Sequence, residues 1–133
     1  MEPKSLSVRR CCRPRATIEE RPLIELEQAA QLESTFKVLA NGTRLRLLHA
    51  LIRTPDMCVT ELAQKLEMKM AAISNQLQLL TLKGILASKR NGNQISYRIV
   101  DPCIRGLLDY GLCLTEELAA DAEFPAAISD EAR

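Results

Sequence analysis

With 133 residues, the chain is long enough to bury the core of one domain and too short for two well-packed ones. Hydrophobic residues make up 47% of it, but only 3% are aromatic and Trp is absent, which favours a helical core of aliphatic side chains. No apolar run approaches the ~20 residues that span a bilayer. The first 21 residues hold five arginines without the apolar stretch of a signal peptide, so we expect a cytoplasmic protein.

Three segments are expected from the distribution of charge and periodicity. Residues 1–22 are basic and lack hydrophobic periodicity, which predicts a mobile N-terminal arm carrying Cys11 and Cys12. Residues 23–119 are expected to form the folded domain. Residues 120–133 are rich in Ala, Asp and Glu and are expected to be a frayed acidic tail.

Two helices open the predicted domain. Residues 23–40 have Leu32, Phe36 and Leu39 at three- and four-residue steps, and Asn41-Gly42 is a typical end signal. Asn41 or Thr43 can cap a second helix over residues 44–53, with Leu45, Leu48, Leu51 and Ile52 facing the core. Thr54-Pro55-Asp56 should end that helix.

The centre of the chain has the pattern of a helix-turn-helix. A short amphipathic segment, residues 59–66, precedes a helix over residues 70–80 by only a few residues. One face of the second helix is apolar (Met70, Ile73, Leu77, Leu80), and the opposite face is uncharged and polar (Ala71, Ser74, Asn75, Gln78). Asn, Gln and Ser present the hydrogen-bond groups that read base edges in a major groove. We therefore predict a recognition helix. The alternative interpretation is an ordinary core helix whose polar face is exposed to solvent.

A basic hairpin follows the predicted recognition helix. Ile95, Tyr97 and Ile99 alternate with polar residues, and Asn91-Gly92 suits a tight turn, which predicts two strands within residues 85–99. From Met68 to Val100 there is no acidic residue, against five Lys or Arg (Lys69, Lys83, Lys89, Arg90, Arg98). Helix, turn, helix and basic hairpin in this order predict a winged helix-turn-helix with a phosphate-facing side.

The last predicted helix starts at Asp101-Pro102, an N-cap residue followed by a first-turn proline. Its apolar stripe (Ile104, Leu107, Leu108, Gly111, Leu114, Leu118) and that of the first helix exceed what one small winged domain can bury. We therefore expect a homodimer that packs through the first and last helices. The fold class is mainly α with a small β-hairpin wing.

Four separated stretches carry a family resemblance. They are Phe36-Lys37-Val38-Leu39-Ala40-Asn41-Gly42-Thr43-Arg44-Leu45-Arg46-Leu47-Leu48, Met57-Cys58-Val59-Thr60-Glu61-Leu62-Ala63, Ile73-Ser74-Asn75-Gln76-Leu77-Gln78-Leu79-Leu80, and Lys83-Gly84-Ile85-Leu86 leading to Gly92 and Tyr97-Arg98-Ile99. In this order, residues 32–118 resemble the ArsR/SmtB family of metal-responsive bacterial repressors. The resemblance implies a dimer that sits on an inverted-repeat operator and leaves it when an inducer binds.

The polar helix face and the basic hairpin together suggest specific DNA contacts. Ser74, Asn75 and Gln78 would read bases, with Ala71 on the same face and Gln76 more peripheral. Lys69, Lys89, Arg90, Asn93 and Arg98 would contact backbone or flanking grooves.

Cysteines are the candidate inducer ligands. Cysteine-based members of the family have a Cys-Val-Cys element before the recognition helix; this chain keeps Cys58 but has Thr60 in place of the second cysteine. Some members complete the site from the N-terminal arm, where this chain has Cys11 and Cys12. The arm between Cys12 and Leu23 can span about 30–35 Å. Three thiolates suit a soft ion: arsenite, antimonite, Cd(II), Pb(II) or Hg(II).

Other sites are less favoured by the sequence. His49, the only histidine, lies in the Leu-rich second helix, and Asp101 and Asp109 lack the histidine partners of a zinc- or nickel-type site. Cys103 and Cys113 point about 80° apart on one helix, so they cannot easily share an ion within one chain. A redox sensor of the same fold using Cys58, Cys103 or Cys113 is the alternative. No phosphate loop or Ser/His/Asp set is present, so we do not expect an enzyme.

Overall fold

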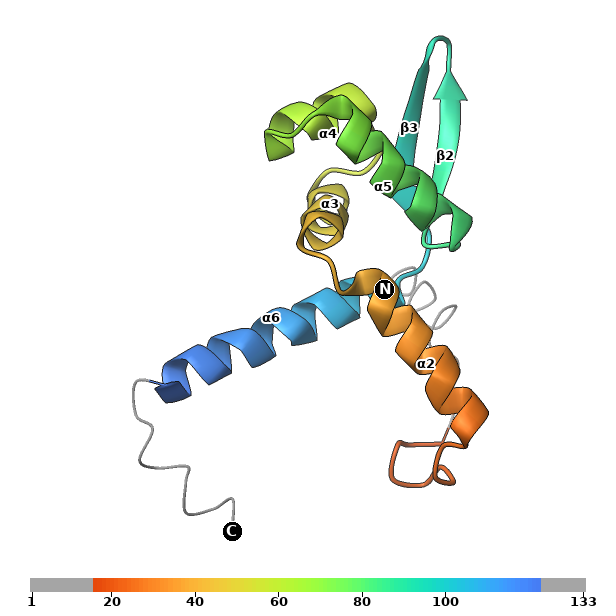
Figure 1. Ribbon diagram of the computed structural model, residues 1–133, viewed down its shortest axis with the longest axis vertical. Helices are drawn as coiled ribbons and strands as arrows, with labels where there is room; N and C mark the ends of the chain where they lie inside the picture. The colour runs from red at the N-terminus through yellow and green to blue at the C-terminus, as the bar shows by residue number, and fades with distance from the viewer. Residues whose placement is uncertain (1–15, 123–133) are drawn as a thin grey trace, which may run out of the picture.

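A helix-turn-helix and a three-stranded sheet make up one end of the molecule, at the top of Figure 1. The structure, a computed structural model, describes residues 16–122. Helices α3 (Gly42–Arg53), α4 (Val59–Leu66) and α5 (Met70–Leu82) pack together on one side of the strands β2 (Leu86–Asn91) and β3 (Gln94–Ile99). We call residues 42–99 the winged-helix body.

The body is held together by aliphatic side chains at helical spacing. Its largest fully buried side chains come from all three helices: Leu47, Leu48, Leu51, Leu62, Ile73, Leu77 and Leu80. The stripe predicted for the recognition helix is confirmed at its last three positions. Met70 in the first turn of α5 is 51% exposed, so the prediction is wrong at this position.

Local signals set the helix ends. Asn41 caps α3, its side chain accepting the backbone N–H of Arg44 at 3.0 Å. Helix α3 therefore begins at Gly42, two residues before the predicted start. Leu45, expected in the core, is 39% exposed on the outer side of this helix. Glu67 ends α4 in the left-handed conformation, with φ of 57°.

The predicted hairpin is present, with a third strand that the sequence did not predict. The sheet order is β1-β3-β2, all antiparallel, where β1 is only Met57–Cys58 and pairs with Tyr97 and Ser96 of β3. Asn91 pairs with Gln94, so Gly92 and Asn93 form a two-residue turn. Gly92 has φ of +64°, a conformation that glycine adopts at little cost.

Two helices project from the winged-helix body (Figure 1). Helix α2 (Leu26–Leu39) starts three residues later than predicted and buries only Leu39. Helix α6 (Cys103–Ala122) contacts α3 near its first turn, where Ile104 is buried. It continues to Ala122, past the bound expected for the tail. No helix in residues 16–122 is long and apolar enough to cross a membrane.

Candidate nucleic-acid interface and cysteine positions

The predicted reading face lies on the outer side of α5. Asn75 and Gln78 are exposed and Ser74 is half-buried, while the opposite side of the same helix is fully buried. Ala71 is exposed one turn before them. The helix thus presents a neutral face of amides and a hydroxyl, held from behind by the core.

The start of α5 carries a cation in place of a cap. Lys69 occupies the N-cap position, and its side chain makes no capping hydrogen bond. Its carbonyl accepts the N–H of Ile73 at 3.1 Å, so the helix begins normally. Unpaired first-turn N–H groups together with an exposed lysine favour an anion at this end of the helix.

Gln76 lies on a different side of α5 from the other predicted DNA contacts. Its side-chain oxygen accepts a 2.6 Å hydrogen bond from the Arg44 Nε. The same guanidinium donates from Nη1 to the Val38 carbonyl at 2.8 Å. Sequence reasoning did not find Arg44, because its partner on α5 is 32 residues away and no local pattern marks it.

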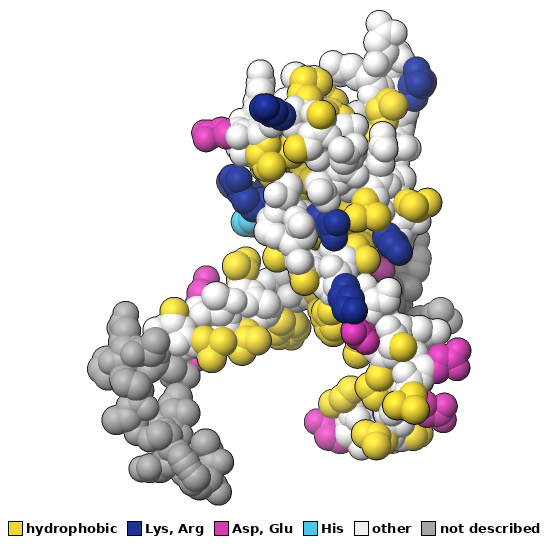
Figure 2. Space-filling model, viewed as in Figure 1, with side chains coloured by type: hydrophobic (Ala, Val, Ile, Leu, Met, Phe, Trp, Pro, Cys, Tyr) yellow, Lys and Arg dark blue, Asp and Glu magenta, His cyan; other side chains and the backbone are white. Residues whose placement is uncertain are grey.

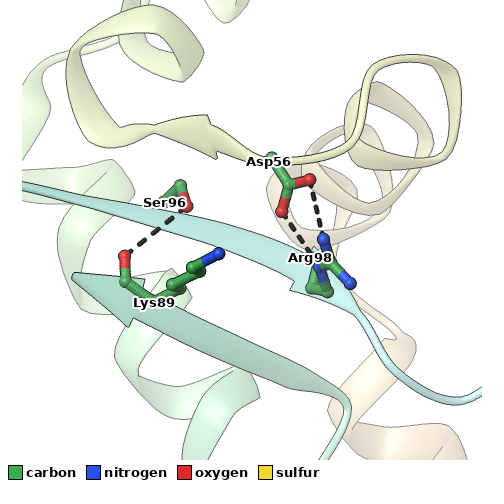
Figure 3. A network of polar contacts seen from close by, with 4 residues as sticks. All are labelled: Asp56, Lys89, Ser96 and Arg98. Carbon is green, nitrogen blue, oxygen red and sulfur yellow. Dashed lines mark hydrogen bonds and ion pairs between the residues drawn. The ribbon is translucent and has the colours of Figure 1, made fainter. Parts of the chain in front are cut away.

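The wing presents its cations at two levels. Lys89, Arg90 and Asn93 are exposed near the tip of the hairpin. Arg98 lies at the base, where Nε and Nη2 donate to the two carboxylate oxygens of Asp56 at 2.9 and 2.8 Å (Figure 3). Arg98 therefore already has a carboxylate partner, and the charge of Lys89 also acts on the Asp56 carboxylate.

The Asp56–Arg98 pair ties the segment before β1 to β3. The backbone N–H of Asp56 also donates to the Tyr97 carbonyl at 3.0 Å. Asp56 has φ of 63°, a region that Asp tolerates better than most residues. The hydrogen bonds from Arg98 and its charge hold the pKa of the Asp56 carboxyl below its ordinary value of 3.8. The pair was not anticipated from the sequence.

Charge is divided between the winged-helix body and the projecting helices. Figure 2 shows Lys and Arg over the body, and acidic and hydrophobic side chains along α2 and α6. This matches the acid-free stretch from Met68 to Val100. An anionic partner is therefore attracted to the body and not to the far ends of the helices.

The cysteines of the described chain lie on different elements, Cys58 on β1 and Cys103 and Cys113 on α6. Cys58 is 8% exposed, a free thiol at the N-cap of α4, where the Glu61 carboxylate accepts its backbone N–H at 2.9 Å. Cys113 is a free, exposed thiol on α6. Cys103, half-buried in the first turn of α6, is disulfide-bonded. Cys11 and Cys12 lie outside the described residues.

No metal cluster is assembled within residues 16–122: no three His, Cys, Asp or Glu side chains are placed to hold an ion. His49 is exposed on α3. The Asp101 carboxylate accepts the backbone N–H of Cys103 at 2.9 Å and so caps the start of α6.

Comparison with known proteins identifies the family. Residues 41–88 match the arsR family of bacterial regulatory proteins. The HTH-type transcriptional regulator NmtR of Mycobacterium tuberculosis is 35% identical over 95 residues, which cover 71% of this chain and 78% of NmtR. The chain belongs to the ArsR family. The family match spans α3, α4, α5 and the start of β2, so the predicted reading face lies within it.

Two solved structures extend the ArsR-family assignment to the whole fold. The crystal structure of the AntR antimony-specific transcriptional repressor is 50% identical, with a TM-score of 0.71, and the match covers 82% of this chain and 98% of AntR. The homodimeric winged helix-turn-helix domain of Mb0332 from Mycobacterium bovis is 27% identical, with a TM-score of 0.59, and the match covers 73% of this chain and 92% of that domain. The predicted winged helix-turn-helix fold is confirmed.

Proposed function

We propose that this ArsR-family protein is a homodimeric transcriptional repressor released from its operator by a thiophilic metal or metalloid ion. The observation that carries the DNA-binding part is the neutral polar face of α5, exposed on a body without acidic residues between Met68 and Val100. The likeness to an antimony-specific repressor over nearly its whole length supports the ion-responsive part.

The dimer would use the apolar faces of α2 and α6. Large hydrophobic side chains stay exposed on both helices in the single chain: Leu26, Leu32, Phe36, Leu107, Tyr110, Leu114 and Leu118. Burying them against a second copy removes apolar area from water, at about 25 cal/mol per Å². The homodimeric state of the Mb0332 domain supports this arrangement.

A dimer would present two copies of α5 to an inverted repeat. Ser74, Asn75 and Gln78 would contact base edges in successive major grooves, with Ala71 against the groove floor. Lys69 and the wing residues Lys89, Arg90 and Asn93 would supply salt-dependent phosphate contacts. Arg98, already paired with Asp56, would support the base of the wing and contact the backbone secondarily.

The inducer would be held by Cys58 together with Cys11 and Cys12. Cys58 belongs to β1 and caps α4, so an ion bound there would disturb both the sheet and the helix-turn-helix. Because its side chain is almost covered, binding would require the start of α4 to open. A coupling free energy of ~1–3 kcal/mol between the two sites would weaken operator binding about 5–150-fold.

The test uses full-length reduced protein and a DNA duplex that the wild type selects from a randomised library. Antimonite, arsenite, Cd(II), Pb(II) and Hg(II) are titrated into the complex while operator release and thiolate-to-metal absorption are followed. The variant with Ser at positions 11, 12 and 58 should keep DNA binding and lose release. Variant Cys113→Ser, which removes a free and exposed thiol, is the matched control. If only this control loses release, the ligand assignment is wrong while the function stands.

A redox-sensing repressor of the same fold is the second candidate, favoured by the disulfide at Cys103. It would use Cys58, Cys103 or Cys113 without metal. Operator binding by metal-free protein is compared before and after mild oxidation, with mass spectrometry of the disulfides formed. Release on oxidation, reversed by a thiol reductant and lost in Cys103→Ser, would favour this candidate over the metal sensor.

A further inference from the structure

One arginine side chain joins three helices of this protein. From α3, the Arg44 guanidinium donates to the Gln76 side-chain oxygen on α5 at 2.6 Å and to the Val38 carbonyl in the last turn of α2 at 2.8 Å. The side chain is half-buried, and Gln76 is half-buried as well. Partly desolvated hydrogen bonds from a charged donor are stronger than neutral ones.

The geometry of this contact is fixed from several sides. The Arg44 backbone N–H is held by the Asn41 cap at 3.0 Å, so the residue starts from a rigid helix end. The Val38 carbonyl lies in the last turn of α2, where carbonyls have no partner within the helix. A guanidinium has only donors, so the Gln76 amide must turn its oxygen toward Arg44.

Gln76 is badly placed to read DNA. At 3.6 residues per turn, a two-residue step rotates the side chain by about 160° to the other side of the helix. Gln76 is two residues from both Ser74 and Gln78, so it points away from the face that these two residues share. Its amide is used within the protein and not offered to a base.

The remaining contacts of α5 with the body are largely apolar, through Ile73, Leu77 and Leu80. The buried stripe fixes which face of α5 turns inward, because a large rotation would expose these side chains. A short charge-assisted hydrogen bond on the flank adds a directional restraint against small rotations within that packing. A small rotation of α5 would move every side chain of the reading face.

We propose that Arg44 is a positioning residue that sets the rotation of the recognition helix through Gln76 and ties it to the end of α2. Gln76 then helps to position the recognition helix and does not itself contact a base. Because α2 carries part of the proposed subunit interface, this contact also links the interface to the reading face. The inference rests on the proposed DNA-binding function.

The first test makes the same substitution, Gln to Glu, on two sides of α5. Gln76→Glu keeps the acceptor oxygen for Arg44, whereas Gln78→Glu removes the amide donor from the proposed reading face and places a charge there. Affinity is measured for the duplex selected by the wild type and for a randomised duplex. We expect Gln76→Glu to stay within about threefold of the wild type and Gln78→Glu to lose more than about tenfold. Equal losses would make Gln76 a DNA contact and overturn the proposal.

The second test is a double-mutant cycle of Arg44→Gln and Gln76→Ala. Each single variant should lower the preference for the selected duplex over the randomised one by about tenfold, and the double variant should lose no more than one of them. The salt dependence of binding should be unchanged, because a lost phosphate contact would reduce the slope by about one.

Additive losses in the cycle, or a smaller salt slope in Arg44→Gln, would overturn the proposal. Thermal unfolding shows whether each variant folds. If Arg44→Gln does not fold, the comparison of Gln76→Glu with Gln76→Ala tests the proposal. Failure of the proposed function has a different signature, since the wild type itself would then select no duplex.

Discussion

Most leucine side chains are buried in the winged-helix body, whereas most are exposed to solvent on the two projecting helices. In the body, Leu47, Leu62 and Leu77 are completely buried within a single chain. On α2 and α6, leucines of the same chain stay in water, including Leu114 at 61% exposure. The body has completed its core within one chain, whereas the proposed dimer would cover the apolar faces of the projecting helices.

Different parts of the chain should therefore govern folding and subunit assembly. Stability of the body should depend on its own side chains, and occupancy of an inverted repeat should depend on the projecting helices. Substitutions in the two regions should therefore fail in different measurements.

The largest effect is expected in the core of the body. Leu77→Ala leaves a cavity behind the reading face and should lower the free energy of unfolding by about 2–5 kcal/mol. Urea unfolding followed by circular dichroism measures this. Leu82→Ala, on the same helix but 82% exposed, is the matched control and should change stability by less than about 0.5 kcal/mol. Equal losses in the two variants would mean that α5 does not pack as described.

A charge on a projecting helix should break assembly and leave the fold intact. Leu114→Glu places a carboxylate on the apolar stripe of α6 and should convert dimers to monomers in light scattering. Operator affinity should fall at least about 100-fold, because two half-sites are no longer held together. Leu112→Glu, about 160° around the same helix, is the control. A monomer produced only by the control would place the interface on the other face.

The smallest effect is expected at the Asp56–Arg98 pair, on the surface of the body. Asp56→Asn removes the charge and keeps a residue that tolerates positive φ. Because the folded-state pKa of Asp56 is lowered, its contribution is present above the unfolded pKa and is lost as pH falls through the folded pKa.

The urea midpoints of wild type and Asp56→Asn should therefore differ slightly at neutral pH and converge below about pH 4. The Glu33–Lys37 pair on α2, 3.1 Å apart and also exposed, provides the comparison in the other region. Glu33→Gln should change the midpoint less, since that pair spans one helix turn and joins no separate elements. A gap for Asp56→Asn that widens in acid would reverse the assigned sign.

Residues with a local signal were predictable from the sequence. Ile73, Leu77 and Leu80 repeat at helical spacing, and Asn41 is a cap directly before a leucine-rich helix, so both helices could be placed within a few residues. The tight turn at Gly92 followed from the need for positive φ between alternating strands.

Contacts between distant parts of the chain were not predictable. Arg44 and Gln76, or Asp56 and Arg98, meet only after the elements have packed, and neither pair shares a periodic pattern. Strand β1 has two residues, too few for any alternation to appear. Met70 continued the apolar pattern of its helix but is half-exposed, and periodicity alone does not tell where the packing against a helix stops.

Because β1 pairs with the base of β3, backbone amides at the base and at the tip of the wing should exchange their hydrogens at different rates. Ser96 and Tyr97 lie between two neighbouring strands, so exposing their amides to solvent requires a larger opening of the body. Arg90, Asn91 and the turn have a neighbouring strand on one side only and can open locally. Hydrogen exchange should therefore be slow at the base and fast at the tip. The tip of such a wing can adapt to a DNA backbone while the pairing of β1, which contains Cys58, with β3 stays intact.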